Sequence, residues 1–400
     1  MKPSTAAIFP TLPVELIELI AESVESVDSD SLLDLRLVCR DLQKKTFNHF
    51  ARRFFSSIRT DLSEESLSRI NALSRHEELR PHVQGLAFML QNGIGRGLVW
   101  NRHSWGSLSS PMEIEQIRRL RDNLVNNLIN CRSFFIVCRY PEGHPDLNRV
   151  TVTDAVAVFF ALVVDSQLPV SSFHLVYANR SSRTLMMDMR RVPKLLYRQP
   201  KFHMVWSNLQ KLSLEQYLTL DNFGFLLELV LCAPNLKTLL LNLGSHDLAA
   251  EFMHELAETV SFTQLEELAL FRTALRAKDL MKLLTSAQDT LKILTFYRIS
   301  VLQEDNWSSV LKSLSQGFVN LTAISLYYLW SNFPKGELLS FPGLEKSPVI
   351  CQTPDQRLHI FYTESQKTQT ALGVEYSGSN MSQVLSLLQT TTVYLYDTAT

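Results

Sequence analysis

A short leucine pattern recurs along the second half of the chain and constrains its fold more than any other feature. The pattern is Leu-x-x-Leu-x-Leu or a close variant, and its copies begin at Leu209, Leu236, Leu265, Leu291 and Leu321. Segments with helical spacing of apolar residues lie between the copies, including 225–232, 248–260, 277–287 and 307–314. A strand and a helix that repeat at this period cannot bury their apolar faces alone. We therefore expect the units to stack side by side around one continuous core.

This period resembles that of leucine-rich repeats, in an irregular form. The asparagine that usually follows the strand is mostly missing, and Asn242 is a candidate remnant. The resemblance implies an α/β fold in which residues 81–345 form a leucine-rich-repeat solenoid of strand–helix units. A first strand is expected at 83–88, and 133–137 and 171–177 are candidate earlier strands, with a helix at 154–165. Residues 346–400 are expected to cap the array or fold back over it, with strands at 358–363 and 392–396 around a helix at 381–388.

Strand alternation predicts which side chains line the open face of such an array. The leucines point into the core, so the residue after the last core position faces outward in each copy. That position is occupied by Glu215, Asn242, Phe271, Tyr297 and Tyr327. Three of these residues are aromatic and come from three neighbouring copies of the pattern. Such a row suits a binding site for a target protein, because aromatic side chains dominate interface energetics. The alternative is that a loop or the C-terminal segment covers this column.

The first 58 residues predict a small helical unit. Pro13 suits the first turn of a helix that carries Leu16, Ile17, Ile20 and Val24 on its apolar side. A polar break at 27–31 precedes a second helix that opens with Leu32 and Leu33. A third helix is expected at 41–58, with Leu42 and four phenylalanines inward. Three short helices form a marginal core, and the excess of apolar residues suggests a face that a partner helix covers.

These residues closely resemble the F-box motif. The segment Leu-Pro-Val-Glu-Leu at 12–16, the paired leucines 32–33 and Leu-Arg-Leu-Val-Cys-Arg at 35–40 follow the order and spacing of that family. Leu42 departs from the pattern, since many members have an aromatic residue there. The resemblance implies docking on a Skp-family adaptor and, through it, on a cullin. The implied adaptor contacts are Leu12, Pro13, Leu16, Ile17, Leu32, Leu33, Leu35, Val38, Cys39 and Arg40. The alternative is a plain three-helix bundle whose leucines face only its own core.

The resemblance divides the chain into an F-box domain at 1–58, a helical connector at 59–80, the repeat array and the C-terminal segment.

The composition of the chain restricts the classes of partner that it is expected to bind. A net charge of -1 and a pI near 6.8 give no reason to expect nucleic-acid binding. The longest apolar run, 155–164, is half the length of a membrane-spanning helix, and no signal peptide is evident, so we expect no membrane association. Five scattered cysteines indicate reduced thiols in the cytoplasm or nucleus.

No catalytic, metal or cofactor site is expected. Cys131, Cys138 and His144 lack a fourth ligand for zinc, and the glycines of residues 93–97 suit a surface loop better than a phosphate cradle. No nucleophile–base signature is present. We therefore expect a non-catalytic substrate receptor of a Skp-cullin-F-box type ubiquitin ligase, as an F-box protein of the fungal type with degenerate repeats. An adaptor-independent leucine-rich-repeat scaffold and an unrecognised hydrolase are the alternatives.

Overall fold

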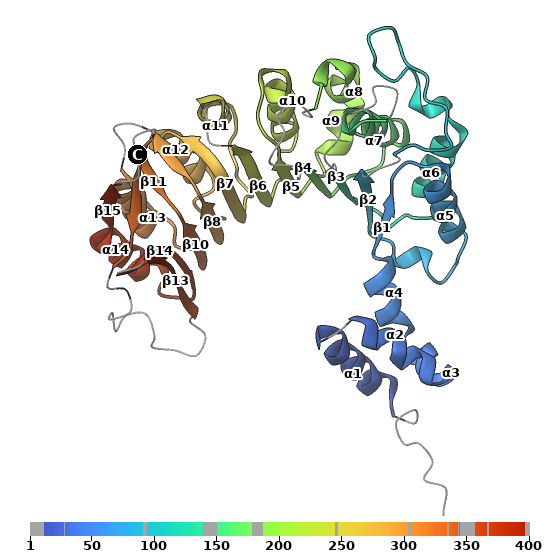
Figure 1. The fold of residues 1–400 in the computed structure, drawn as a ribbon, viewed down its shortest axis with the longest axis horizontal. Coiled ribbons are helices and arrows are strands. Elements are labelled where there is room, and N and C mark those ends of the chain that lie inside the picture. The colour runs from blue at the N-terminus through green and yellow to red at the C-terminus, as the bar shows by residue number, and fades with distance from the viewer. Residues whose placement is uncertain are drawn as a thin grey trace, which may run out of the picture.

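The computed structural model of the chain describes residues 12–27, 29–90, 94–138, 150–177, 187–244, 247–302, 306–333, 336–342, 344, 357–365 and 368–396. These residues form a mixed α/β structure with fourteen α-helices and fifteen strands, most of them parallel. The strands follow the inner side of an open arc, and most helices follow its outer side (Figure 1). None of the helices in these ranges is long and apolar enough to cross a membrane.

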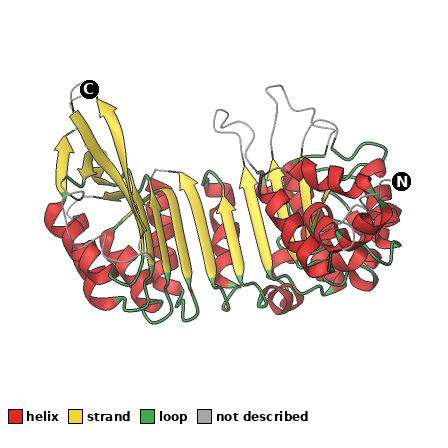
Figure 2. Ribbon diagram, turned by 90° about the horizontal axis from the view of Figure 1, so that it is seen from below, coloured by secondary structure: helices red, strands yellow, loops and turns green. Residues whose placement is uncertain are grey.

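The main sheet is a run of parallel strands that neighbour one another in chain order (Figure 2). They are β1 (Ser57–Thr60), β2 (Gly85–Leu90), β3 (Ser133–Cys138), β4 (Ser172–Tyr177), β5 (Lys211–Glu215), β6 (Thr238–Gly244), β7 (Glu267–Leu275), β8 (Ile293–Tyr297) and β10 (Ala323–Tyr327). The leucine copies expected from the sequence supply β5, β6, β7, β8 and β10. The predicted strands at 83–88, 133–137 and 171–177 are also present, as β2, β3 and β4.

The register of these strands lines up two inward columns of buried side chains. One column is Ile58, Leu86, Phe134, Phe173, Leu212, Leu239, Leu268, Leu294 and Ile324; the other is Thr60, Phe88, Ile136, Leu175, Leu214, Leu241, Leu270, Phe296 and Leu326. The sheet therefore begins at β1, one strand earlier than predicted. This strand was missed because it has four residues, only one of which is a large aliphatic.

Helices cover the outer face of the sheet and complete the core (Figure 1). They are α5 (Glu64–Ser74), α6 (Glu115–Asn126), α7 (Val152–Ser166), α8 (Leu195–Arg198), α9 (Pro200–Trp206), α10 (Leu220–Leu231), α11 (Asp247–Thr259), α12 (Ala277–Ser286), α13 (Trp307–Gly317) and α14 (Met381–Thr391). Short 3-10 turns lie at Arg80–His82, Pro111–Glu113 and Met189–Arg191. Side-chain caps begin several of these helices, with capping boxes at Thr151 and Thr219.

The C-terminal segment extends the sheet. Strand β14 (Thr368–Ser377) pairs antiparallel with β10, β13 (Arg357–Ser365) pairs with β14, and α14 packs beside α13. A second, smaller sheet contains β9 (Ser300–Leu302), β11 (Trp330–Phe333), β12 (Glu337–Ser340) and β15 (Val393–Tyr396). The predicted strands at 358–363 and 392–396 and the helix at 381–388 are present, whereas β14 was not expected.

The N-terminal unit lies beyond the β1 end of the array (Figure 1). It comprises α1 (Val14–Val27), α2 (Ser29–Val38), α3 (Arg40–Lys45) and α4 (Phe47–Phe55). The single third helix predicted at 41–58 is wrong, because the chain breaks at Thr46 and the helix ends at Phe55. At this break the Thr46 hydroxyl donates to the Leu42 carbonyl at 2.7 Å, and the Thr46 N–H donates to the same carbonyl at 2.9 Å.

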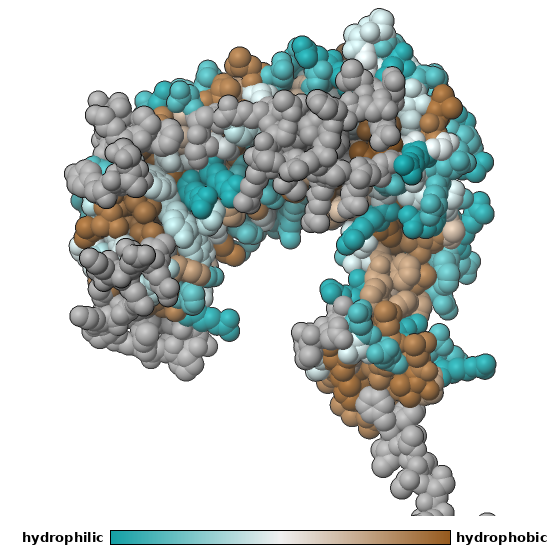
Figure 3. Space-filling view, in the orientation of Figure 1, coloured by the Kyte–Doolittle hydropathy of each residue, from teal (hydrophilic) through white to brown (hydrophobic). Residues whose placement is uncertain are grey.

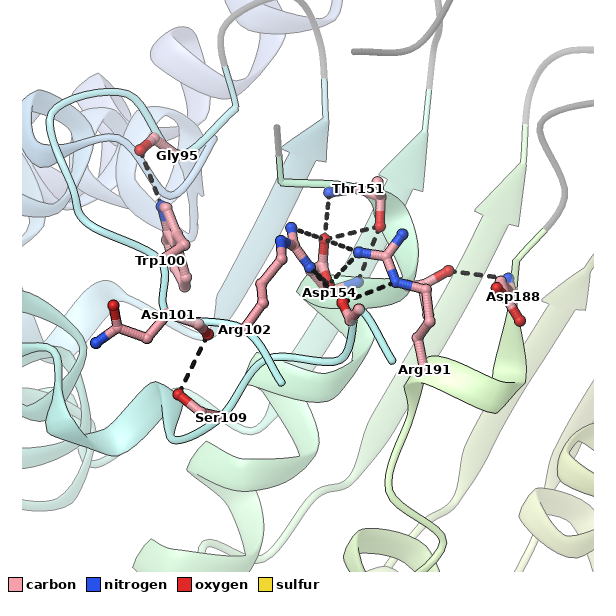
Figure 4. A network of polar contacts seen from close by, with 11 residues as sticks. Gly95, Trp100, Asn101, Arg102, Ser109, Thr151, Asp154, Asp188 and Arg191 are labelled. Carbon is pink, nitrogen blue, oxygen red and sulfur yellow. Dashed lines mark hydrogen bonds and ion pairs between the residues drawn. The ribbon is translucent and has the colours of Figure 1, made fainter. Parts of the chain in front are cut away.

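A buried ion cluster fastens loop segments to the start of α7 (Figure 4). The Asp154 carboxylate is almost completely buried and accepts two hydrogen bonds from Arg102 at 2.7 and 2.8 Å. Arg191 reaches the same carboxylate at 3.2 Å, and both guanidinium groups also donate to the Gly106 carbonyl. Hydrogen bonding to Asp154 raises the pKa of Arg102. Three distant chain segments are thereby tied together in the first half of the array.

Substituting Asp154→Ala should lower the free energy of unfolding by about 3–5 kcal/mol, because two largely buried guanidinium groups lose their counter-charge. Asp165→Ala on the same helix is the matched control. Asp165 bonds Arg121 at 2.6 Å on the surface, and its loss should cost about 0–1 kcal/mol. Urea denaturation of both variants checks the difference. Equal losses for the two aspartates would contradict a special role for the buried cluster.

Candidate functional site

The N-terminal unit exposes much of its apolar surface. Of the predicted adaptor contacts, Ile17 and Leu32 are fully buried and belong to the core of the unit. The other eight lie at the surface or partly exposed: Leu12, Pro13, Leu16, Leu33, Leu35, Val38, Cys39 and Arg40. Val38 is 68% exposed and Leu16 is 46% exposed, values far above those of core residues. The motif residues therefore divide into a structural pair and a surface set.

Two members of the surface set, Leu12 and Leu16, line a shallow apolar groove. The groove has a volume of about 600 Å³ and is lined by Leu12, Leu16, Leu19, Ile20, Ser23, Val24 and Ser31. Hydrophobic surface gathers over these helices (Figure 3). Leu19 and the 82% exposed Leu37 were not among the predicted contacts. The helical spacing of Leu16 and Leu19 was the available signal. We call this groove, with Leu37 and Val38, the N-terminal apolar face.

Polar contacts hold the helices beneath this face in place. The Arg36 guanidinium lies 3.9 Å from the centre of the Phe50 ring and donates to the Gln43 carbonyl at 2.9 Å. Burial lowers the pKa of Arg36. The Lys45 ammonium donates to the Leu12 carbonyl at 3.0 Å, which fastens the start of the unit to α3. These contacts fix the positions of the helices that carry the exposed apolar side chains.

On the open face of the sheet, the five residues predicted as target contacts lie side by side. Glu215, Asn242, Phe271, Tyr297 and Tyr327 are register partners on β5, β6, β7, β8 and β10, and all are partly exposed. The Phe271 and Tyr297 ring centres are 6.1 Å apart, and those of Tyr297 and Tyr327 are 6.2 Å apart. We call these five residues the open-face column. The structure brings all of its members together.

The C-terminal hairpin continues this column. The Phe361 ring of β13 lies 4.6 Å from that of Tyr327, and the Tyr327 hydroxyl donates to Glu375 Oε2 at 3.0 Å. Burial and this carboxylate raise the pKa of Tyr327, so its hydroxyl is neutral. Gly373 leaves room for the ring, since a Cβ there would stand 2.5 Å from Tyr327 Cδ1. The hairpin thus fixes the last aromatic ring from one side.

A second row of residues follows the aromatic ones and adopts left-handed backbone geometry. Arg272, Arg298 and Tyr328 have φ values of 48°, 57° and 49°. Each lies one residue after a column aromatic, at the bend between the main sheet and the smaller sheet. Non-glycine residues adopt this geometry at a cost of about 1 kcal/mol or more. No glycine marked these bends in the sequence, so they were not predicted.

These bends place cationic groups beside the aromatic rings. The Arg298 guanidinium lies 5.5 Å from the centre of the Tyr297 ring and 5.6 Å from that of Tyr328. A cavity of about 390 Å³ opens between the rows and is lined by Glu215, Leu240, Asn242, Phe271, Arg272 and Tyr297. Aromatic, amide and charged groups around an open hollow suit a peptide surface rather than a small apolar ligand.

Neither the cysteine pair nor the glycine-rich segment belongs to the two surfaces described above. Cys131 and Cys138 are buried thiols, and burial raises the pKa of Cys131 to about 12. Their proposed neighbour His144 lies outside the described residues, as does Gly93 of the glycine-rich segment. The Gly95 carbonyl accepts from the Trp100 indole at 3.0 Å, so this loop packs on its own side chain.

Models of known protein families give no match for this chain, and neither does a search of curated proteins. The N-terminal apolar face is a short helical patch, and the open-face column is a row across parallel strands. Both are suited to contacts with other proteins.

Gly373→Ala should lower the free energy of unfolding by about 1–3 kcal/mol, because the new methyl group displaces the Tyr327 ring. Gly224→Ala is the control. A Cβ at Gly224, within α10, meets no atom within 4 Å, so this change should stabilise the protein by about 0.5–1 kcal/mol. Thermal denaturation and the near-ultraviolet tyrosine signal measure both effects. Destabilisation by Gly224→Ala alone would contradict the packing described.

Proposed function

We propose that this chain is the substrate-recognition subunit of a Skp-cullin-F-box type ubiquitin ligase. Its N-terminal unit would be an F-box that docks on a Skp-family adaptor. The rest of the chain would be an irregular leucine-rich-repeat solenoid that binds a protein target. The observation that carries the proposal is the N-terminal apolar face, whose exposed residues include Leu16 and Val38 of the F-box pattern.

The proposal that the N-terminal unit docks on an adaptor rests on the number of apolar side chains that this unit leaves exposed. Val14, Leu16, Leu19, Leu37 and Val38 are all exposed on two short helices. Exposed apolar patches on small helical units mark protein interfaces, and a partner helix in the groove would remove this surface from water. The buried Ile17 and Leu32 would support the contact indirectly by holding the unit together.

The proposal that the array binds a protein target rests on the open face of its strands. The inward columns fill the core, which leaves the open-face column to contact a partner. Such a receptor performs no chemistry and needs no cofactor. Its effect is proximity: a target held by the array experiences a raised effective concentration of the ubiquitin carried by other subunits. A cytoplasmic or nuclear location fits this role.

Replacing Leu16 and Val38 together by alanine should weaken adaptor binding by about 30-fold or more, the effect expected on losing two interface anchors. Both side chains are exposed, so the fold should persist. The control is Val319→Ala, since Val319 is 87% exposed on the distant part of the array. Calorimetric titration with purified adaptor measures the change. If the intact chain binds no Skp-family adaptor, the proposal fails and the adaptor-independent scaffold takes its place.

Replacing Phe271, Tyr297 and Tyr327 together by alanine should abolish target capture, because each aromatic anchor contributes about 2 kcal/mol or more in a typical interface. Adaptor binding should be unchanged. The measurement compares proteins that co-purify from cells in which ubiquitin transfer is blocked. Trp105→Ala is the control, because Trp105 is an exposed aromatic outside the column. Unaltered capture by the triple variant would contradict a role for the column.

A further inference from the structure

Three potential metal ligands meet on the helical side of the array, away from both binding surfaces. His203 lies on α9, Glu228 lies in the last turns of α10, and Cys232 ends that helix. Their ligand atoms all lie within 4.8 Å of one another. No sequence pattern marks this set, because His203 stands 25 residues before Glu228. The packing of α9 on α10 creates the cluster.

The two distances from the cysteine sulfur match those between ligands of a tetrahedral zinc site. Cys232 Sγ lies 3.4 Å from His203 Nδ1 and 3.5 Å from Glu228 Oε1. Ligands at zinc bond lengths of about 2.0–2.3 Å in tetrahedral geometry stand about 3.5 Å apart. One sulfur, one imidazole nitrogen and one carboxylate oxygen are ligand types that zinc combines readily. The helices are also already joined, since the Trp206 indole donates to the Leu229 carbonyl at 2.8 Å.

A nucleophilic role for the same cysteine does not fit. Burial, reinforced by the nearby Glu228 carboxylate, raises the pKa of Cys232 to about 12, so the thiol is protonated at neutral pH. Reactive cysteines instead have lowered pKa values and a positive neighbour. A bound dication changes this balance, because a coordinated thiol is deprotonated and its charge is compensated by the metal.

A second cluster, His254, Glu258 and Asp279, provides a useful contrast. Glu258 pairs with Lys282 at 2.7 Å, and Asp279 lies 3.7 Å from Arg276. Cationic side chains already balance those carboxylates. No ion pair to Glu228 occurs among the described residues, where its closest polar partner is the neutral Cys232 thiol. The first cluster therefore has a negative charge to offer a cation.

We propose that His203, Glu228 and Cys232 bind a single Zn²⁺ ion, with water as the fourth ligand. The thiol proton leaves to solvent when the Zn–S bond forms. The ion would cross-link α9 to α10 and so brace two neighbouring units of the array. This site is independent of adaptor docking and of target capture, because its ligands lie on neither surface.

The test uses the full chain, first stripped with a chelator and then titrated with Co²⁺ and Zn²⁺. One equivalent of Co²⁺ should produce a thiolate-to-cobalt charge-transfer band, which Zn²⁺ should abolish. Cys232→Ser should eliminate the band, and His203→Gln and Glu228→Gln should each weaken binding at least tenfold. Zn²⁺ should raise the melting temperature of the wild-type chain but not of Cys232→Ser.

Glu258→Gln is the matched control, since it removes a glutamate beside a histidine in the contrasting cluster. It should leave the cobalt band intact. The surface variant His203→Gln keeps the test decisive if Cys232→Ser fails to fold. Absence of the band in the wild-type chain overturns the proposal. A band that survives both His203→Gln and Cys232→Ser also overturns it.

Discussion

The stacking of two inward columns across nine parallel strands is the constraint on which the array depends. No single strand and helix can bury its own apolar residues, so each unit is stabilised by its neighbours. Leu212, Leu239 and Leu268 show this directly, because register pairing places them in one buried row. The antiparallel strand β14 pairs with β10 and so covers the outer edge of the final parallel strand.

Because the inward residues of each strand fill the core, the outward residues are available for contacts with a partner. Phe271, Tyr297 and Tyr327 alternate with core residues, so their side chains are not needed to fill the interior. They are nevertheless ordered by one another and by the hairpin, through Phe361 and Gly373. Ordered aromatic rings lose little further conformational freedom when they meet a partner, which favours tight binding. A fixed row is thus better suited to recognition than mobile side chains of the same type.

The sequence predicted the features that arise from local periodicity. Leucine spacing located the later strands, and strand alternation placed the open-face column. Features that depend on distant contacts were missed: β14, the left-handed bends at Arg272 and Arg298, and the meeting of His203 with Cys232. The motif also could not separate Ile17, which packs inward, from Leu16, which is exposed. Adjacent helical residues share a pattern but differ in direction, and only the packed unit resolves them.

The two surfaces differ in what holds them, and this difference bears on how they would work together. The N-terminal apolar face belongs to four short helices with a small core, so a partner that covers it would also stabilise the unit. The open-face column belongs to a long, continuous core that needs no partner to remain folded. Docking at one end can therefore strengthen the weaker unit without altering the array. Under the proposed function, a target would meet the same preformed surface whether or not an adaptor is bound, so the two interactions should be energetically independent.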